Sequence, residues 1–341
     1  MLVKKSKMNR RDFIATSLTA GAAATLVGKN VFGKEASPEW LKRPATVIRI
    51  SNSEVMKKDG TVNAELVQKM VDKALCVFAD VKDVSEAWSK FVRPEDIAGL
   101  KINTLGLKSI RNTNHVSHFH AVNNALISGL TRLGLKSENI IIWDRNDRDL
   151  SNAGYMPVTS GKGVRCYGTK EHAGFDEREY SVGKVKTRFS NILTRQTTAL
   201  INVAQAKSHR LAGITAAMKN HYGSINNPKE FHDNACCNPG IAEIYSLAPV
   251  QQKTRLIIVD ALYAVIEGGP GWSLHYMRPM NSILVATDPV AVDRVVLEMI
   301  DGIRKAEGME PLANRVKFLE AASELKLGKA DLGGIDLVDI N

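Results

Sequence analysis

The chain has 341 residues, of which 44% are hydrophobic and 24% are charged. This composition is ordinary for a globular protein and leaves room for a large core, which excludes a disordered or fibrous chain. The formal net charge is +10, but about half of that excess lies in residues 1–33. The remainder contains no basic run and few aromatic residues, which argues against nucleic-acid binding.

The N-terminus carries an export motif. Residues 9–16 read NRRDFIAT, with Arg10 and Arg11 side by side, and an apolar run follows. This pattern resembles a twin-arginine export signal. Because the apolar run is shorter than the roughly 20 residues that cross a bilayer, we expect no stable membrane span. We predict an export signal over 1–33, a linker over 34–44, periplasmic localisation, and the twin-arginine translocase as a partner during export.

The first half of the chain alternates strand and helix patterns. Apolar residues at i, i+3 and i+4 predict helices, and short β-branched or apolar runs predict strands. The expected elements are a strand at 46–50, a helix at 63–79 with Asn63 as its N-cap, a strand at 100–105, a helix from about 117 to 133 that ends at Gly134, and a strand at 139–144. Three consecutive Ile residues make the last strand apolar on both faces, as in a parallel strand with helices on each side.

The second half repeats this order. We expect a strand at 199–203, a helix at 211–218, strands at 255–260 and 282–287, a helix beginning at Asp288 and Pro289, a helix at 312–325 and a strand at 335–340. Asn103 and Asp144, at strand ends of the first half, are echoed by Asn202 and Asp260, although chance similarity would also explain this. If the echo is real, all four lie at the carboxyl edge of a parallel sheet, where open α/β folds bind ligands.

These patterns predict an α/β fold with a mostly parallel sheet, helices on both faces and two pseudo-similar halves. A single large domain is expected over residues 45–341. Residues 151–198 have weaker periodicity and more glycine and charge. We expect them to form an inserted irregular region, either a lobe or a long excursion over the sheet.

The stretch 199–237 is unusually rich in reactive side chains. Lys207 and His209 follow the first expected strand there, and Lys219 and Asn220 follow the expected helix. Loops at these points would aim the side chains across the carboxyl edge of the sheet. Lys207 and His209 are therefore candidates for catalysis, while Lys219 and Asn220 would bind a cofactor or orient an anionic small molecule.

Three residues outside that stretch complete the candidate set. Asp260, at a strand end, is a third catalytic candidate, and Asn103 and Glu267 are candidates for cofactor binding. Glu267 opens a loop rich in Gly and Pro at 267–271. No Gly-Lys-Ser/Thr follows this loop, which excludes a P-loop.

A metal site is one of three interpretations of the stretch 199–237. His232 and Cys236 are four residues apart, so one helical turn would bring them to a shared face. His209, His232 and Cys236 are the candidate ligands for a transition metal, although the spacing matches no standard zinc framework. A polar substrate site without metal and structural hydrogen bonding are the alternatives, and Cys236 and Cys237 could instead form a vicinal disulfide.

A second histidine cluster lies at the start of the helix expected near residue 117. His115, His118 and His120 would point to different faces there, so we interpret them as solvated residues rather than metal ligands.

Five phrases of the sequence are distinctive, at 206–215, 218–223, 259–262, 267–270 and 288–293. They resemble the domain of unknown function 362 family, in its twin-arginine-exported branch. The resemblance extends from about residue 101 to 339. Some members of that family carry a ferredoxin-like module with C-x-x-C clusters. This chain has no C-x-x-C motif, which makes an iron–sulfur cluster doubtful here.

Together these observations predict an exported α/β protein with a polar site at the carboxyl edge of its sheet. The site would bind a metal or redox cofactor, with oxidoreductase-like chemistry, and an anionic small molecule. The alternative is a periplasmic ligand-binding or accessory protein that performs no catalysis. Whether the protein is an enzyme, and on which substrate, stays open at this point.

Overall fold

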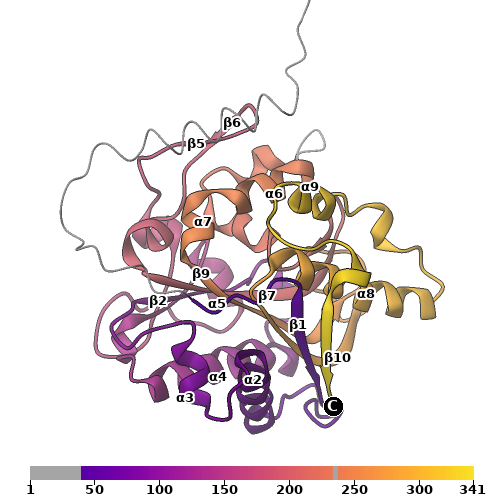
Figure 1. The fold of residues 1–341 in the computed structure, drawn as a ribbon, viewed down its shortest axis with the longest axis horizontal. Coiled ribbons are helices and arrows are strands. Elements are labelled where there is room, and N and C mark those ends of the chain that lie inside the picture. The colour runs from indigo at the N-terminus through magenta and orange to yellow at the C-terminus, as the bar shows by residue number, and fades with distance from the viewer. Residues whose placement is uncertain (1–39, 233–236) are drawn as a thin grey trace, which may run out of the picture. The chain divides into compact units, whose positions relative to one another are not determined.

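The centre of the fold is a long, mixed β-sheet (Figure 1). The computed structural model describes residues 40–232 and 237–341, so the expected export signal and Cys236 lie outside the described residues. In spatial order the strands are β11 (Asp336–Ile340), β1 (Thr46–Ser51), β10 (Met277–Ala286), β9 (Thr254–Val265), β7 (Ala199–His209), β2 (Ala98–Lys101), β3 (Ile140–Asp144) and β4 (Arg165–Gly168). A ninth strand, β8 (Gly213–Thr215), pairs with the end of β7.

The sheet is mostly parallel. Strands β9, β7, β2, β3 and β4 are parallel neighbours, whereas β10 pairs antiparallel with both β9 and β1. The carboxyl ends of the five parallel strands therefore lie at one edge. This confirms the predicted fold class and places the chain segments after β2, β3 and β4 beside the end of β7.

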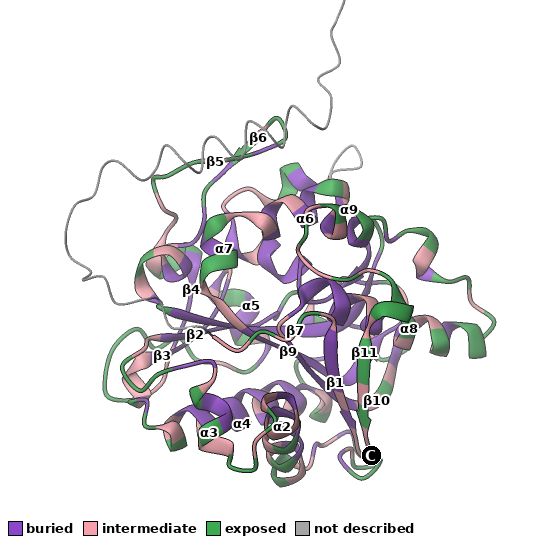
Figure 2. Cartoon of the chain, in the orientation of Figure 1, coloured by how far each residue is buried: buried purple, intermediate pink, exposed green. Residues whose placement is uncertain are grey.

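Helices cover both faces of the sheet (Figures 1 and 2). The helices are α2 (Ala64–Ala79), α3 (Val84–Ser89) and α4 (Ser117–Leu133) on one face, α6 (Cys237–Ser246), α7 (Ala248–Lys253), α8 (Pro289–Ala306) and α9 (Phe318–Glu324) on the other, and the short α5 (Asp147–Asn152) after β3. The Ile run of β3 shows the two-sided burial directly. Ile141 packs in the core under α6 to α9, while Ile140 and Ile142 pack in the core under α2 to α4.

Local sequence signals set the helix ends where they were predicted. The side chain of Asn63 accepts a hydrogen bond from the Leu66 backbone N–H at the start of α2. Asp288 caps α8 by accepting from two backbone N–H groups, with Pro289 as the first helical residue. Gly134 ends α4 with a φ of 107°, which glycine adopts without strain.

The prediction of a helix at 211–218 was wrong. Strand β7 does not end at residue 203 but continues to His209, turns back through Gly213 at a φ of 80°, and pairs with β8. The segment that follows is a short 3-10 helix, η7 (Lys219–Ser224). Residues 213–215 pair with residues 207–209 of β7, and this pairing favours an extended strand over the local helix propensity.

Two other expectations changed in detail. The irregular region 151–198 contributes β4 to the main sheet and forms a separate hairpin from β5 (Tyr180–Val182) and β6 (Val185–Thr187). The helix expected at 312–325 is a 3-10 turn followed by the shorter α9. Among the described residues, none of the helices combines the length and apolar composition needed to cross a membrane.

The loop 267–271 packs tightly against β7. The Gly269 backbone N–H donates to Ser208 Oγ at 3.1 Å, and a Cβ atom on Gly269 would lie 1.8 Å from the Ser208 carbonyl oxygen. A Cβ atom on Gly271, in the same loop, would meet no atom within 4 Å.

We therefore expect Gly269→Ala to lower the free energy of unfolding by about 1–3 kcal/mol, because the loop or β7 must shift to remove the clash. Gly271→Ala is the matched control and should leave it unchanged or slightly higher. Chemical denaturation of the two variants measures this difference. Equal stability of the two would contradict the close packing of the loop on β7.

Candidate functional site

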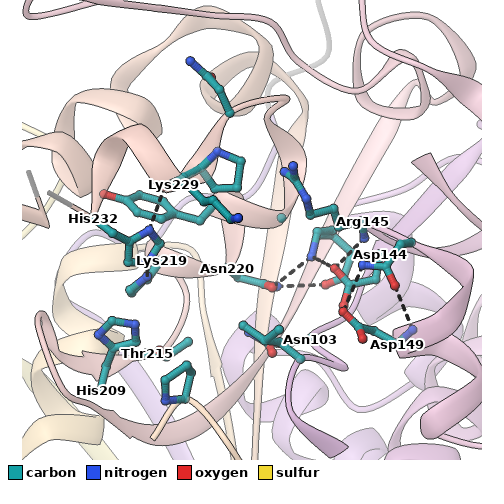
Figure 3. Close-up of a pocket in the computed structure, with 18 of the residues that line it drawn as sticks. Asn103, Asp144, Arg145, Asp149, His209, Thr215, Lys219, Asn220, Lys229 and His232 are labelled. Atoms are coloured by element: carbon teal, nitrogen blue, oxygen red, sulfur yellow. Dashed lines mark hydrogen bonds and ion pairs between the residues drawn. The ribbon is translucent and has the colours of Figure 1, made fainter. Parts of the chain in front are cut away.

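A cavity of about 640 Å³ opens at the carboxyl edge of the sheet (Figure 3). Its walls come from the segments after β2, β3 and β4, from β7 and β8, from η7, and from a second 3-10 helix, η8 (Pro228–Phe231). Seven Lys and Arg side chains line it against three carboxylates, so it attracts anions. The seven cationic residues are Lys101, Arg145, Arg148, Lys170, Lys207, Lys219 and Lys229.

These cations differ in depth. Arg148, Lys170 and Lys229 are exposed, whereas Lys101, Lys207 and Lys219 are buried. Exposed charges are screened by water and mainly steer a ligand towards the site. The buried ones interact in a lower dielectric, so their partners decide what the cavity binds.

The charge of Lys101 is compensated by neighbouring acceptors. Its Nζ donates to Asp144 Oδ1 at 2.8 Å, to the Ile102 carbonyl oxygen at 2.6 Å and to Asn220 Oδ1 at 3.1 Å. Asp144 also accepts from the backbone N–H and the hydroxyl of Thr104, both at 2.7 Å. Burial lowers the pKa of Lys101 and opposes ionisation of Asp144, but the Lys101 charge and the Thr104 hydrogen bonds hold the pKa of Asp144 below its ordinary value. The pair therefore connects the ends of β2 and β3 and has no donor left for a ligand.

Asn220 has a structural role beside this pair. Its amide nitrogen donates to Asn202 Oδ1 at 2.7 Å and to the Lys101 carbonyl oxygen at 3.0 Å. Asn202 in turn donates to the Ala217 carbonyl oxygen at 2.8 Å. These bonds hold η7 against β2 and β7, so Asn220 lines the cavity with its amide already used.

Lys207 is in a different situation from Lys101. Its Nζ donates to Asn103 Oδ1 at 3.0 Å and to the Leu105 carbonyl oxygen at 3.2 Å, and both acceptors are neutral. The part of the chain that the structure describes offers Lys207 no ion pair, and the Trp272 ring centroid lies 5.6 Å from Nζ. Burial lowers the pKa of Lys207 to about 7, and the charges of Lys219 and Lys101 act in the same direction against the opposing charge of Asp144.

His209 presents an N–H group to the cavity. Its Nδ1 accepts hydrogen bonds from the backbone N–H groups of Leu211 and Ala212, both at 3.1 Å. Burial, with the nearby Lys219 charge, lowers the pKa of His209 to about 2, so the ring is neutral at pH 7 with its proton on Nε2. A metal bound at Nε2 would need the lone pair that this proton occupies.

Lys219 and His232 face each other on the side of the cavity that also carries His209 (Figure 3). The ring centroids of His209 and His232 are 5.6 Å apart. Lys219 Nζ lies 3.0 Å from His232 Nε2 and 4.1 Å from the centroid of the Tyr222 ring. His232 Nδ1 donates to the Pro228 carbonyl oxygen at 2.7 Å, which leaves Nε2 to accept from Lys219. Thr215 also lines the cavity, and its buried hydroxyl has no hydrogen-bond partner among the described residues.

The structure brings most of the predicted site residues together. Those that line the cavity are Asn103, Lys207, His209, Lys219, Asn220 and His232. Asp260 and Glu267 do not. Cys236 lies outside the described residues, and the Cys237 thiol donates to the Phe231 carbonyl oxygen at 3.6 Å. No group of three or more metal-ligating side chains forms within residues 40–232 and 237–341.

Asp260 and Glu267 have partners elsewhere. Asp260 Oδ2 lies 2.6 Å from His118 Nδ1, and both side chains are fully buried. The interpretation of His118 as a solvated residue was therefore wrong, because the packing of α4 on the sheet encloses it. Glu267 accepts a hydrogen bond from Arg304 at 2.6 Å and thereby holds the start of its loop to α8.

Several lining residues were not predicted. Arg145, Arg148 and Asp149 follow directly on β3, and this charged cluster after a buried strand was an available signal. Lys101 could also have been noticed as a charge at the end of an apolar strand. Thr215 was missed because its segment was expected to be helical.

Asp293, on α8, supports the cavity from outside. Its carboxylate accepts hydrogen bonds from the backbone N–H groups of Ala217 at 2.6 Å and Met218 at 3.1 Å, immediately before Lys219. Burial raises the pKa of Asp293 to about 7. The position of η7 therefore depends on a carboxyl group that titrates near neutral pH.

Among the comparisons with known proteins, the family model alone shows a family, and that family is defined without a known function. The family described as Domain of unknown function (DUF362) matches residues 99–298. None of the curated proteins compared with the chain matches it. A protein from Thermotoga maritima with a crystal structure is similar at a TM-score of 0.39 and 10% identity, over 79% of this chain and 60% of that one. The chain thus spans less than two thirds of that protein, and a similarity this weak supports no inference about function.

The raised pKa of Asp293 predicts a pH-dependent stability. The carboxyl group contributes stability that is fully present below its ordinary pKa and is lost as the pH rises through about 7. We expect Asp293→Asn to gain stability relative to the unmodified protein between pH 5 and pH 8, by more than about 1 kcal/mol. Denaturant unfolding at both pH values measures this.

Asp59→Asn is the control for that experiment. Hydrogen bonds from Thr61 lower the pKa of Asp59, so it stays ionised between pH 5 and pH 8 and its variant should show no such trend. A difference between Asp293→Asn and the unmodified protein that is the same at both pH values would show that Asp293 does not titrate in this range.

Proposed function

The chain belongs to the family described as Domain of unknown function (DUF362), and we propose that it binds a small anionic molecule in the cavity at the carboxyl edge of its sheet. One observation carries this proposal. Lys207 is buried in a cavity with seven cationic side chains and has only neutral hydrogen-bond acceptors. An anion beside Lys207 would supply the missing counter-charge.

The energetics favour such a ligand. Charge on Lys207 is disfavoured by burial and by Lys219 and Lys101, and this lowers its pKa. A carboxylate or phosphate oxygen bound in this part of the cavity opposes that effect, because its negative charge offsets the repulsion among the cationic groups. Charge-assisted hydrogen bonds of this kind are about twice as strong as neutral ones.

Neutral donors complete the site. The Thr215 hydroxyl is buried without a partner among the described residues, and leaving such a group unpaired costs free energy. His209 Nε2–H is a second donor that carries no charge. Both groups match the acceptor oxygens of an anion. The volume of about 640 Å³ is within the usual range for small-molecule sites.

The metal or redox cofactor expected from the sequence receives less support than the anion. His209 directs an N–H, not a lone pair, to the cavity, and His232 Nε2 lies within hydrogen-bond distance of Lys219. Cys236, the third expected ligand, lies outside the described residues. The proposed function is therefore anion binding through Lys, Thr and His donors, and it holds for a binding protein as well as for an enzyme.

Titration with inorganic phosphate and with small carboxylates tests the proposal. We expect both classes to raise the thermal unfolding temperature at pH 7, and this effect should weaken as salt is added. Lys219→Met should weaken binding roughly 10- to 100-fold, and Thr215→Val about 2- to 10-fold, as expected for the loss of a charged and a neutral hydrogen bond.

Lys184→Met provides the matched control for these variants. Lys184 is exposed in the turn between β5 and β6 and does not line the cavity, so its removal changes the net charge but not the site. Circular dichroism of each variant first confirms that it folds. Equal affinities of the Lys219→Met and Lys184→Met proteins would place the anion elsewhere.

Export by the twin-arginine route is a separate proposal. It rests on Arg10, Arg11 and the apolar run after them. We expect the full chain to appear in the periplasmic fraction of a bacterial host. Arg10→Lys with Arg11→Lys keeps the charge but removes the arginine pair, and it should retain the protein in the cytoplasm. Export of the double variant at the original level would contradict a twin-arginine signal.

A further inference from the structure

Two buried lysines line the same cavity, and their hydrogen bonds differ in number. An ammonium group donates three hydrogen bonds, whereas a neutral primary amine donates two and keeps one lone pair. Lys101 Nζ has three oxygen acceptors, one of them the Asp144 carboxylate. Lys207 Nζ has two, Asn103 Oδ1 and the Leu105 carbonyl oxygen, within the described chain. The two acceptors of Lys207 therefore match the two N–H groups of a neutral amine, which keeps its lone pair.

The groups that would hold an anion lie on the same face as this amine. Lys207 and Thr215 are directly opposite each other in the antiparallel pair β7–β8, so their Cβ atoms are about 5 Å apart on one face. His209, two residues along β7, shares that face. Lys219 is close enough to Lys207 to lower its pKa. An anionic group bound by Thr215 and Lys219 would therefore lie on the face of the β7–β8 pair that also carries Lys207.

We propose that Lys207 is a nucleophile that forms an imine with the carbonyl carbon of a 2-oxo acid whose carboxylate is held by Lys219 and Thr215. This deepens the proposed anion binding and rests on it. A 2-oxo acid fits because one small molecule then carries a reactive carbonyl for the amine of Lys207 and a carboxylate for Lys219 and Thr215.

The reaction balances without any other reagent. The lone pair on Nζ attacks the carbonyl carbon, a C–N bond forms and the C=O double bond opens to give a carbinolamine. The oxygen then leaves as water and takes up both protons that the amine carried, which leaves a C=N bond. His209 Nε2–H, on the same face, is placed to donate a hydrogen bond to the carbonyl oxygen as it gains negative charge.

The local environment supports nucleophilic chemistry at Lys207. Burial beside other cationic groups is a known way to keep a lysine amine neutral near pH 7, and it lowers the pKa of Lys207 accordingly. The Trp272 ring, with its centroid 5.6 Å from Nζ, covers the amine with an apolar surface. Exclusion of water from such a site slows hydrolysis of the imine.

Reductive trapping tests the proposal. The full-length folded protein is incubated with pyruvate and cyanoborohydride at pH 7, which reduces an imine to a stable 1-carboxyethyl amine. Intact-mass measurement should show one adduct per chain, and peptide mapping of the unmodified sequence should locate it on Lys207. Lys207→Arg retains a cation but cannot form an imine, so the adduct yield should fall at least about tenfold. Lys184→Arg, at an exposed lysine outside the cavity, should leave the yield unchanged.

The outcomes separate this inference from the proposed function. If phosphate and pyruvate raise the unfolding temperature but no adduct forms, or if adducts spread over exposed lysines, the imine proposal is overturned and the anion-binding proposal stands. A protein that responds to neither anion would overturn both. Peptide mapping of the unmodified protein decides the case even if the Lys207→Arg protein does not fold.

Discussion

The buried ion pair between Lys101 and Asp144 is the interaction on which the cavity depends. It joins the carboxyl ends of β2 and β3, and through Asn220 it also fixes η7 above them. A buried charge is tolerated only where its partners compensate for lost hydration, and here every donor of Lys101 and both oxygens of Asp144 are used. The walls of the cavity are therefore set before any ligand enters.

Lys207 is buried at the same edge of the sheet as Lys101, but its hydrogen-bond acceptors are neutral. It shares with Lys101 a position at the end of a parallel strand, but Asn103 and Leu105 give it neutral acceptors in place of a carboxylate. Within the described residues, Lys207 forms no ion pair and the Thr215 hydroxyl has no hydrogen-bond partner. A protein core normally avoids both situations. The two residues lie on one face of the β7–β8 pair, which is why a ligand, rather than packing, accounts for them best.

Prediction from the sequence succeeded where the signal was local and periodic. The Ile run of β3, the Asn63 cap of α2 and the Asp288 cap of α8 each act over a few residues, and each was found where expected. The prediction of a helix at 211–218 failed because the composition of this segment favours a helix, whereas residues 213–215 pair with β7 as a strand. Gly213 permits the reversal, and pairing of Lys207 with Thr215 depends on β9 and the loop 267–271 lying alongside β7.

The sequence by itself determined the α/β class, the two-sided burial of the sheet, the ends of α2 and α4 and the start of α8. It also determined the gathering of Lys207, His209, Lys219 and Asn220 at one edge. Hydrophobic period, capping residues and strand order all follow from the order of residues along the chain. Only the tertiary structure decided which of these groups have hydrogen-bond partners and opposite charges beside them. Both Lys101 and Lys207 are lysines near the end of an apolar strand. Lys101 forms an ion pair with Asp144, 43 positions away, whereas Lys207 donates to the neutral amide of Asn103, 104 positions away. Charge pairing acts through space, so the chemistry of the cavity follows from the fold rather than from the spacing of its residues.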